Sequence, residues 1–289
     1  TDPVNINGDG TYNNTDALSV EITYDGGVSG ITFEGGSAGD DIDGGDGNDT
    51  LIGNGGDDEI DGGAGIDTVV FSGNFANYTV SNGSFIFDGP DGEDEAVNVE
   101  IAEFDDVTVR LVGSGSEYAT IQAAIDAADE GDIILVQAGT YTESLSITKS
   151  ITLLGQDTDN DGNPDTILTP ASGHGIALSG DIDDGGAGLV TIENFAVNGA
   201  TGAGVNIASN TVLDTLVVTN SSFADNSVFG IGSGSGALGV ANVDINNSSF
   251  EDNGQGGSNG SGDIVLFNFH GNANIEDVTI TSTRSHGDG

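Results

Sequence analysis

One nine-residue unit occurs four times in succession from Gly35 to Val70: GGSAGDDID, GGDGNDTLI, GNGGDDEID and GGAGIDTVV. The sixth residue of every unit is an aspartate and the eighth is apolar. The glycines allow a tight turn with positive φ, in which backbone carbonyl groups can point at a cation, and the aspartates add carboxylates. The repeat therefore predicts a β-roll whose turns bind calcium. The expected ligands are the four aspartates at the sixth places: Asp40, Asp49, Asp58 and Asp67.

Two units make one full coil of such a roll, so every second turn stacks on the same side. This arrangement predicts that Asp40 lies with Asp58, and Asp49 with Asp67. The first unit has Ala38 where glycine is expected, and alanine tolerates a left-handed backbone poorly. We therefore expect the first turn to be distorted or weakly occupied.

These residues resemble the RTX, or haemolysin-type, calcium-binding repeat, and the resemblance continues through a segment of the kind that often closes such rolls. It covers about residues 35–111 and implies a β-roll that needs calcium to fold. A flexible linker rich in glycine and aspartate is the alternative, which the strict ninefold spacing disfavours. The family implies export by a type I secretion machine, hence a secreted or cell-surface protein, and we expect the chain to be a piece of a longer one. Residues 1–34 are expected to be the end of a preceding β module or a linker.

The chain carries 48 Asp and Glu against three Lys and Arg, a formal net charge of −45. Such a surface makes nucleic acid and anionic membranes poor partners. No run of 18 apolar residues occurs, so no membrane insertion is expected. Because the chain has no cysteine, bound calcium is expected to take the stabilising role that disulfides have in other extracellular proteins.

Residues 112–289 predict a different all-β solenoid. Ile121, Ala124, Ile125 and Ala128 recur at helical spacing before a strand that begins at Ile133, which predicts one short amphipathic helix capping a stack of strands. Residues 131–143 fit the pattern GDxIxVxxGTYxE. This stretch resembles the entry to the right-handed parallel β-helix of the pectate-lyase-like superfamily. The fold class expected for the whole chain is thus a parallel β-roll followed by a right-handed parallel β-helix.

A longer repeat supports the β-helix. Segments that begin at residues 192, 218, 245 and 275 align, each with Asn or Asp at the third place. Asn194, Asn220 and Asn247 are expected to stack at one corner and to hydrogen-bond along the ladder. Phe223 and Phe250 are interpreted as stacked core residues.

A second acidic motif is DTDNDGNPD at residues 157–165, with aspartates at places one, three, five and nine and glycine at six. It matches the start of an EF-hand-type loop, although place twelve, Leu168, cannot supply the usual acid. We expect calcium here, the alternative being a solvated acidic turn. The expected ligands are Asp157, Asp159, Asp161 and Asp165. Residues 88–95 and 181–185 are interpreted as plain acidic loops.

Catalytic candidates are few. Arg284, His286 and Asp288 are the one group with acid, base and cation close in sequence, in a glycine-rich loop. The sequence therefore favours a calcium-binding structural or adhesive protein, with extracellular polysaccharide or other copies of the chain as possible partners. The alternative is a polysaccharide lyase or C-5 epimerase whose active site lies mostly outside these residues. Modular mannuronan C-5 epimerases share this architecture, but their catalytic motif is not found in the chain.

Overall fold

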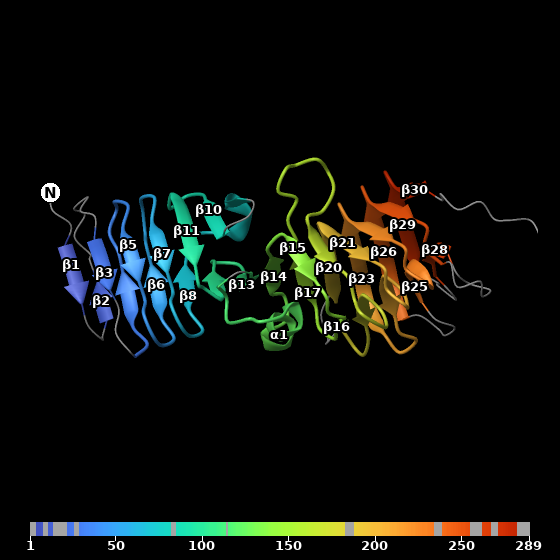
Figure 1. The fold of residues 1–289 in the computed structure, drawn as a ribbon, viewed down its shortest axis with the longest axis horizontal. Coiled ribbons are helices and arrows are strands. Elements are labelled where there is room, and N and C mark those ends of the chain that lie inside the picture. The colour runs from blue at the N-terminus through green and yellow to red at the C-terminus, as the bar shows by residue number, and fades with distance from the viewer. Residues whose placement is uncertain are drawn as a thin grey trace, which may run out of the picture. The chain divides into compact units, whose positions relative to one another are not determined.

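The structure is a computed structural model that describes residues 4–7, 11–13, 22–25, 29–81, 85–113, 115–182, 188–233, 239–254, 262–266 and 271–281. The regular secondary structure of these residues is almost all strand, and the chain divides into two compact units, Thr1–Ala119 and Thr120–Gly289 (Figure 1). The first unit is a parallel β-roll, and the second is a parallel β-helix that begins with a short helix. The predicted fold class is confirmed.

The first unit has two sheets, with consecutive repeat strands placed alternately in one and the other. One sheet runs β1 (Val4–Asn7), β3 (Ile22–Asp25), β5 (Asp41–Asp43), β7 (Glu59–Asp61), β11 (Glu93–Val97), β10 (Phe85–Asp88) and β9 (Thr79–Ser81). The other runs β2 (Thr11–Asn13), β4 (Thr32–Glu34), β6 (Thr50–Ile52), β8 (Thr68–Val70), β12 (Ile101–Glu103) and β13 (Thr108–Val112). Strands β3 and β4 pair in parallel with the repeat strands β5 and β6, and β1 and β2 pair in parallel with β3 and β4. These four strands thus extend both sheets ahead of the repeats.

The core of the roll consists of one inward side chain from each short strand. Ile42 pairs with Ile60 in one sheet, and Leu51 pairs with Val69 in the other. All four are at most 1 % exposed. The apolar residue at the eighth place of each repeat thus faces the interior, as the sequence predicts.

An insertion that includes residues 71–81 and 85–88 carries a 3-10 helix, η1 (Phe75–Asn77), and the antiparallel strands β9 and β10. Its rings pack into a cluster in which Phe71 stacks on Phe104 with centroids 5.0 Å apart, and Phe87 lies 4.8 Å from Phe71. After this insertion β11 and β12 rejoin the parallel sheets beside β7 and β8.

The second unit has three parallel sheets. The first runs β14 (Ile133–Val136), β17 (Ile151–Leu154), β20 (Leu189–Glu193), β23 (Val212–Thr219), β26 (Gly239–Asn246) and β29 (Asn272–Glu276). The second runs β15 (Gly139–Tyr141), β18 (Thr166–Leu168), β21 (Phe195–Asn198), β24 (Ser222–Ala224), β27 (Ser249–Glu251) and β30 (Thr279–Thr281). The third runs β16 (Leu145–Ile147), β19 (Ile176–Leu178), β22 (Val205–Ile207), β25 (Phe229–Ser233) and β28 (Gly262–Val265).

Helix α1 (Ile121–Ala127) packs against β14 and β16 of the first coil. The Thr120 hydroxyl caps it by accepting from the Ala123 N–H at 3.1 Å. Glu143, from outside the helix, accepts from the N–H groups of Ile121 and Gln122, which places negative charge at the positive end of the helix. The predicted helix is confirmed, and its apolar face is buried.

The interior of the β-helix contains the predicted aromatic stack. Phe223 and Phe250 are 0 % and 1 % exposed, and their rings stack with centroids 5.1 Å apart. The asparagine corner is only partly as predicted. Asn247 donates to Asn220 Oδ1 at 2.7 Å, but Asn220 donates to Glu193 at 3.2 Å rather than to Asn194.

Candidate metal sites

The turns of the roll share a backbone that glycine makes possible. In the second, third and fourth repeats the second and fourth places have φ between 69° and 146°, and the residues are Gly45, Gly47, Asn54, Gly56, Gly63 and Gly65. In the first repeat neither Gly36 nor Ala38 has a positive φ. The first turn therefore differs in backbone from the other three, at the unit where alanine replaces glycine.

The repeat aspartates form two columns. The N–H of Asp40 donates to Oδ1 of Asp58 at 2.8 Å, and the N–H of Asp49 donates to Oδ1 of Asp67 at 2.8 Å. These are the two pairs that the sequence predicts. The second column begins with Ile31, whose N–H donates to Asp49 Oδ1 at 2.7 Å. An apolar side chain thus occupies the aspartate position at that end.

The four repeat aspartates are buried, and three of them have a carboxylate oxygen without a hydrogen-bond partner. Asp40 and Asp58 are 3 % exposed, Asp49 is 1 % and Asp67 is 0 %. The Oδ2 atoms of Asp49, Asp58 and Asp67 are buried and have no hydrogen-bond partner. A buried carboxylate oxygen without a donor is strongly unfavourable unless a cation compensates it. Carboxylate and carbonyl oxygens are the ligands calcium prefers, so these turns fit a calcium ion.

The electrostatics of the columns indicate the same need. Loss of hydration on burial, with a smaller effect from neighbouring carboxylates, raises the pKa of Asp67 to about 7. The same causes raise the pKa of Asp58 to about 6. A bound divalent cation favours the ionised form and reverses such shifts.

Two acidic residues that the sequence analysis did not assign extend the columns. Asp58 donates its N–H to Asp94 Oδ1 at 3.0 Å, and Asp67 donates its N–H to Glu100 Oε2 at 2.8 Å. Asp94 and Glu100 are 2 % and 1 % exposed. The interpretation of residues 88–95 as a plain acidic loop was wrong, because the segment enters β11 and carries its aspartate into the column.

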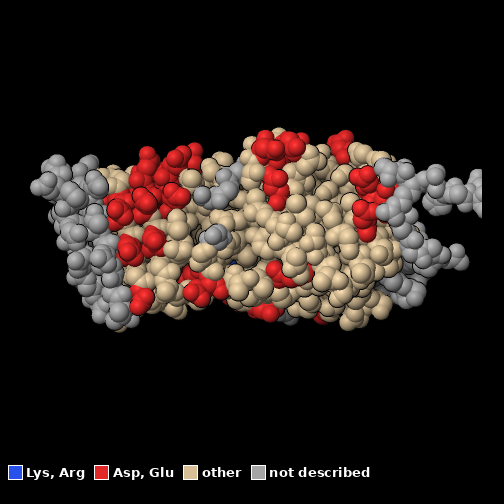
Figure 2. All heavy atoms as spheres, viewed as in Figure 1, with Lys and Arg blue, Asp and Glu red and all other residues tan. Residues whose placement is uncertain are grey.

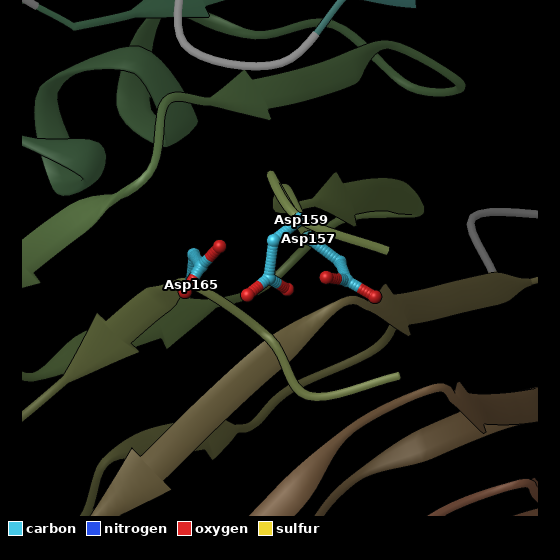
Figure 3. A group of neighbouring side chains, drawn as sticks. All are labelled: Asp157, Asp159 and Asp165. Carbon is cyan, nitrogen blue, oxygen red and sulfur yellow. The ribbon is translucent and has the colours of Figure 1, made fainter. Parts of the chain in front are cut away.

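The loop at residues 157–165 brings together three of its four predicted ligands (Figure 3). Carboxylate oxygens of Asp157, Asp159 and Asp165 lie within 4.8 Å of one another. Asp161 is not in this group, and its Oδ1 accepts from the backbone N–H and the Nδ2 of Asn163. Asp157 Oδ2 accepts from the Gly162 N–H at 2.9 Å, while its Oδ1 is buried without a partner. The loop can thus supply oxygen ligands to a cation.

The described basic side chains are held by structural contacts. Arg110 is 9 % exposed and donates to the Tyr118 hydroxyl at 3.1 Å. Lys149 donates to the carbonyl of Ala128, just beyond α1, at 2.5 Å. His174 Nδ1 accepts from the Ala203 N–H at 2.9 Å. Figure 2 shows one face of the molecule, on which Asp and Glu side chains lie in several groups. The candidate catalytic residues Arg284, His286 and Asp288 lie outside the described residues.

The family model of the RTX calcium-binding nonapeptide repeat matches residues 34–69, in four copies. No curated protein and no solved structure matches the chain. In the part of the chain that the structure describes, no helix has the length and apolarity to span a membrane. The chain thus carries calcium-binding repeats of the RTX type within a strand-rich parallel fold.

Proposed function

We propose that the chain is part of a secreted or cell-surface structural protein whose roll, at residues 35–111, folds when its turns bind calcium. The observation that carries the proposal is the set of buried, unpartnered Oδ2 atoms on Asp49, Asp58 and Asp67. Those residues are sixth-place aspartates of the matched repeats. A bound calcium ion supplies the positive charge that compensates the negative charge of these buried oxygens.

The balance of forces in the roll supports the view that folding requires calcium, and that calcium does not merely bind to a roll that is already folded. Each short repeat strand buries one apolar side chain, which contributes roughly 1.5 to 3 kcal/mol. Ordering the glycine-rich turns and crowding their carboxylates oppose this gain. Millimolar calcium is found outside cells, which is why we place the protein there. Export by a type I machine belongs to the same proposal, by analogy with the family.

We also propose that the loop at residues 157–165 binds a calcium ion through Asp157, Asp159 and Asp165. The support is the cluster of three carboxylates and the buried, unpartnered Oδ1 of Asp157. Place twelve of the motif, Leu168, is 0 % exposed and lies in β18, so it gives no ligand. This site is expected to stabilise its own loop and not the β-helix as a whole.

The test is hydrogen exchange of the full chain, measured by mass spectrometry on peptides, in chelator-treated buffer with and without millimolar calcium. At pH 7.5 peptides from the roll should gain protection only with calcium, because at this pH its strands form only when the turns are filled. Peptides from β17 to β26 should be protected in both conditions. Magnesium is the control, since its short octahedral bonds suit these turns poorly. Equal protection of the roll without calcium would contradict the proposal.

Contact with extracellular polysaccharide or with other copies of the chain stays a prediction from the sequence. The pectate-lyase-like relationship and the lyase or epimerase alternative also stay predictions, and the residues proposed for that chemistry lie outside the described part of the chain. The hydrogen-exchange test of calcium binding does not depend on any of these predictions.

A further inference from the structure

Residues 89–97 read GPDGEDEAV and lie outside the four matched repeats. Glycine stands at the first and fourth places of this segment, aspartate at the sixth and an apolar residue at the eighth. This is the pattern of the repeats, with Pro90 in place of the second glycine. The segment is separated from the fourth repeat by residues 71–88, which form the insertion with η1, β9 and β10.

The backbone of this segment follows that of the fourth repeat. Gly92, at the fourth place, has φ 141°, close to the 146° of Gly65 at the same place of the fourth repeat. A Cβ on Gly92 would lie 1.7 Å from the Gly56 carbonyl oxygen, and a Cβ on Gly65 would lie 1.7 Å from that of Gly47. Only glycine fits either position. Residues 89–94 therefore stack on turn 53–58 as turn 62–67 stacks on turn 44–49.

The hydrogen bonds between the stacked turns also correspond. Gly56 donates its N–H to the Asp91 carbonyl at 2.9 Å, as Gly47 donates to the Ala64 carbonyl at 2.7 Å. Glu93 donates its N–H to Asp57 Oδ1 at 3.1 Å. In the matched pair of turns the equivalent bond runs from the Ile66 N–H to Asn48 Oδ1, also at 3.1 Å.

The aspartate and the strand complete the correspondence. Asp58 donates its N–H to Asp94 Oδ1, the bond that Asp49 makes to Asp67. Glu95 donates its N–H to the Asp58 carbonyl at 2.9 Å, and Ala96 then pairs with Ile60 in β7. Residues 89–97 thus continue the same column with the same register.

The site between these turns has the features that indicate a cation. Asp94 is 2 % exposed and Asp58 is 3 % exposed, and Asp58 Oδ2 is buried with no partner. Two carboxylates buried one above the other are unfavourable without positive charge between them.

The other column ends differently. Glu100 takes the aspartate position below Asp67, but both of its oxygens are used, since Oε2 accepts from the Asp67 N–H and Oε1 from the Glu117 N–H at 2.8 Å. The turn that leads to Glu100 begins at Asn98, directly after β11, and is too short to hold the glycine pattern. Glu100 therefore closes its column, whereas Asp94 extends the other.

We propose that residues 89–94 form a fifth calcium-binding turn and that an ion binds between this turn and turn 53–58, with the carboxylate of Asp94 as a ligand. This inference rests on the proposed function, that the turns of the roll bind calcium. It extends the metal sites beyond the four repeats and across an insertion in the chain. The insertion is thus accommodated without ending the column.

The test counts the calcium ions bound to the full chain by equilibrium dialysis against radioactive calcium. Asp94→Asn keeps the shape of the side chain and an acceptor for the Asp58 N–H but removes the charge, so this variant should bind one ion fewer than the unsubstituted chain. Glu93→Gln is the matched control, because it removes the same charge from an exposed neighbouring side chain, and its count should not change. An unchanged count for Asp94→Asn would overturn the fifth turn, whereas no calcium on the unsubstituted chain would overturn the proposed function itself.

A second measurement covers the case in which Asp94→Asn fails to fold, which circular dichroism in saturating calcium would detect. The unsubstituted chain is then crystallised in calcium, and ions are located by anomalous scattering. The expected result is an ion between turns 53–58 and 89–94. Ions in the other turns with none beside Asp94 would overturn the proposal.

Discussion

The backbone N–H of Asp49 donates a hydrogen bond to Oδ1 of Asp67 over 2.8 Å, although the two residues are 18 positions apart in the chain. The other carboxylate oxygen of Asp67 is buried and has no partner. One carboxylate therefore joins two turns of the roll and still offers an oxygen to an ion. Loss of a single aspartate should thus disturb the turn it belongs to and the turn it bonds.

Asp58→Ala should lower the calcium affinity of the roll more than Asp40→Ala. Asp58 lies between two bonded neighbours in its column, Asp40 and Asp94, while Asp40 belongs to the first turn, whose backbone departs from the others. Isothermal titration of both variants with calcium measures the difference, which we expect to reach about tenfold, or 1.4 kcal/mol. Asp41→Ala, an exposed position, is the control with little expected effect. The opposite ranking would mean that the first turn is the stronger site.

The ion-free roll should be more stable at pH 5 than at pH 7.5. Burial raises the folded-state pKa of Asp67 to about 7 and of Asp58 to about 6, above the unfolded value of about 3.9. Between these values the folded state binds more protons than the unfolded state, so stability falls as pH rises. The stability that each raised pKa contributes is fully present below the unfolded-state pKa. It is lost as the pH rises through the folded-state pKa values. Hydrogen exchange of roll peptides in chelator measures this trend, as protection that is greater at pH 5 than at pH 7.5.

A substitution at Asp67 is the control for this pH dependence. Asp67→Asn removes one of the titrating groups, so the difference in stability between the two pH values should shrink in this variant. Calcium affinity should change in the opposite sense, falling on acidification because protons compete for the carboxylates. Roll peptides that are no better protected in chelator at pH 5 than at pH 7.5 would contradict the prediction.

The sequence predicts the four-repeat roll well because almost every place of the unit has its own physical requirement. A positive φ, a carboxylate and an inward apolar residue recur at fixed spacing, so the strand register and the pairing of Asp49 with Asp67 follow. The turn that contains Asp94 was missed for two physical reasons. Residues 71–88 separate it from the other repeats, and Pro90 replaces the glycine at its second place. The pairing of β11 with β7 shows that it stacks in register.

The asparagine corners of the β-helix show a similar limit. Asn194, Asn220 and Asn247 all have positive φ, between 43° and 56°, which explains the residue type because asparagine tolerates that backbone. Their hydrogen-bond partners depend on how successive coils are offset, and an isolated motif carries no information on that. For the same reason the buried pair formed by Asn226 and Asn253 could not be predicted, since it depends on the close approach of two turns. In the 157–165 loop, likewise, the local bond from Asn163 to Asp161 is a detail that the motif does not specify.

Glu59→Lys should stabilise the calcium-loaded roll by about 0.5 to 1 kcal/mol at low ionic strength. Glu59 pairs directly with Asp41 on one side and with Glu95 on the other, so three like charges form a row on the outer face of the sheet. Lysine replaces two repulsive contacts by attractive ones at an exposed position. The gain in urea stability should decrease at high salt, because exposed charges are screened. Glu59→Gln should give part of the gain, and no gain for lysine at low salt would show that the row is already neutralised by bound ions.

Asn226→Ala should destabilise the β-helix by about 3 kcal/mol, because a buried polar network would lose several partners at once. Asn226 is 0 % exposed; its Nδ2 donates to the Val197 carbonyl and to Asn253 Oδ1, both at 2.9 Å, and its Oδ1 accepts from the Ala200 N–H at 3.0 Å. Asn220→Ala should cost less, about 1 kcal/mol, chiefly for placing alanine at φ 50°. Asn220→Gly separates the two causes, because glycine relieves the backbone strain without restoring the side chain. Urea unfolding in saturating calcium, followed through exchange of peptides from β20 to β26, compares the three variants. A loss for Asn226→Ala no larger than that for Asn220→Ala would contradict the stabilising role of the buried network.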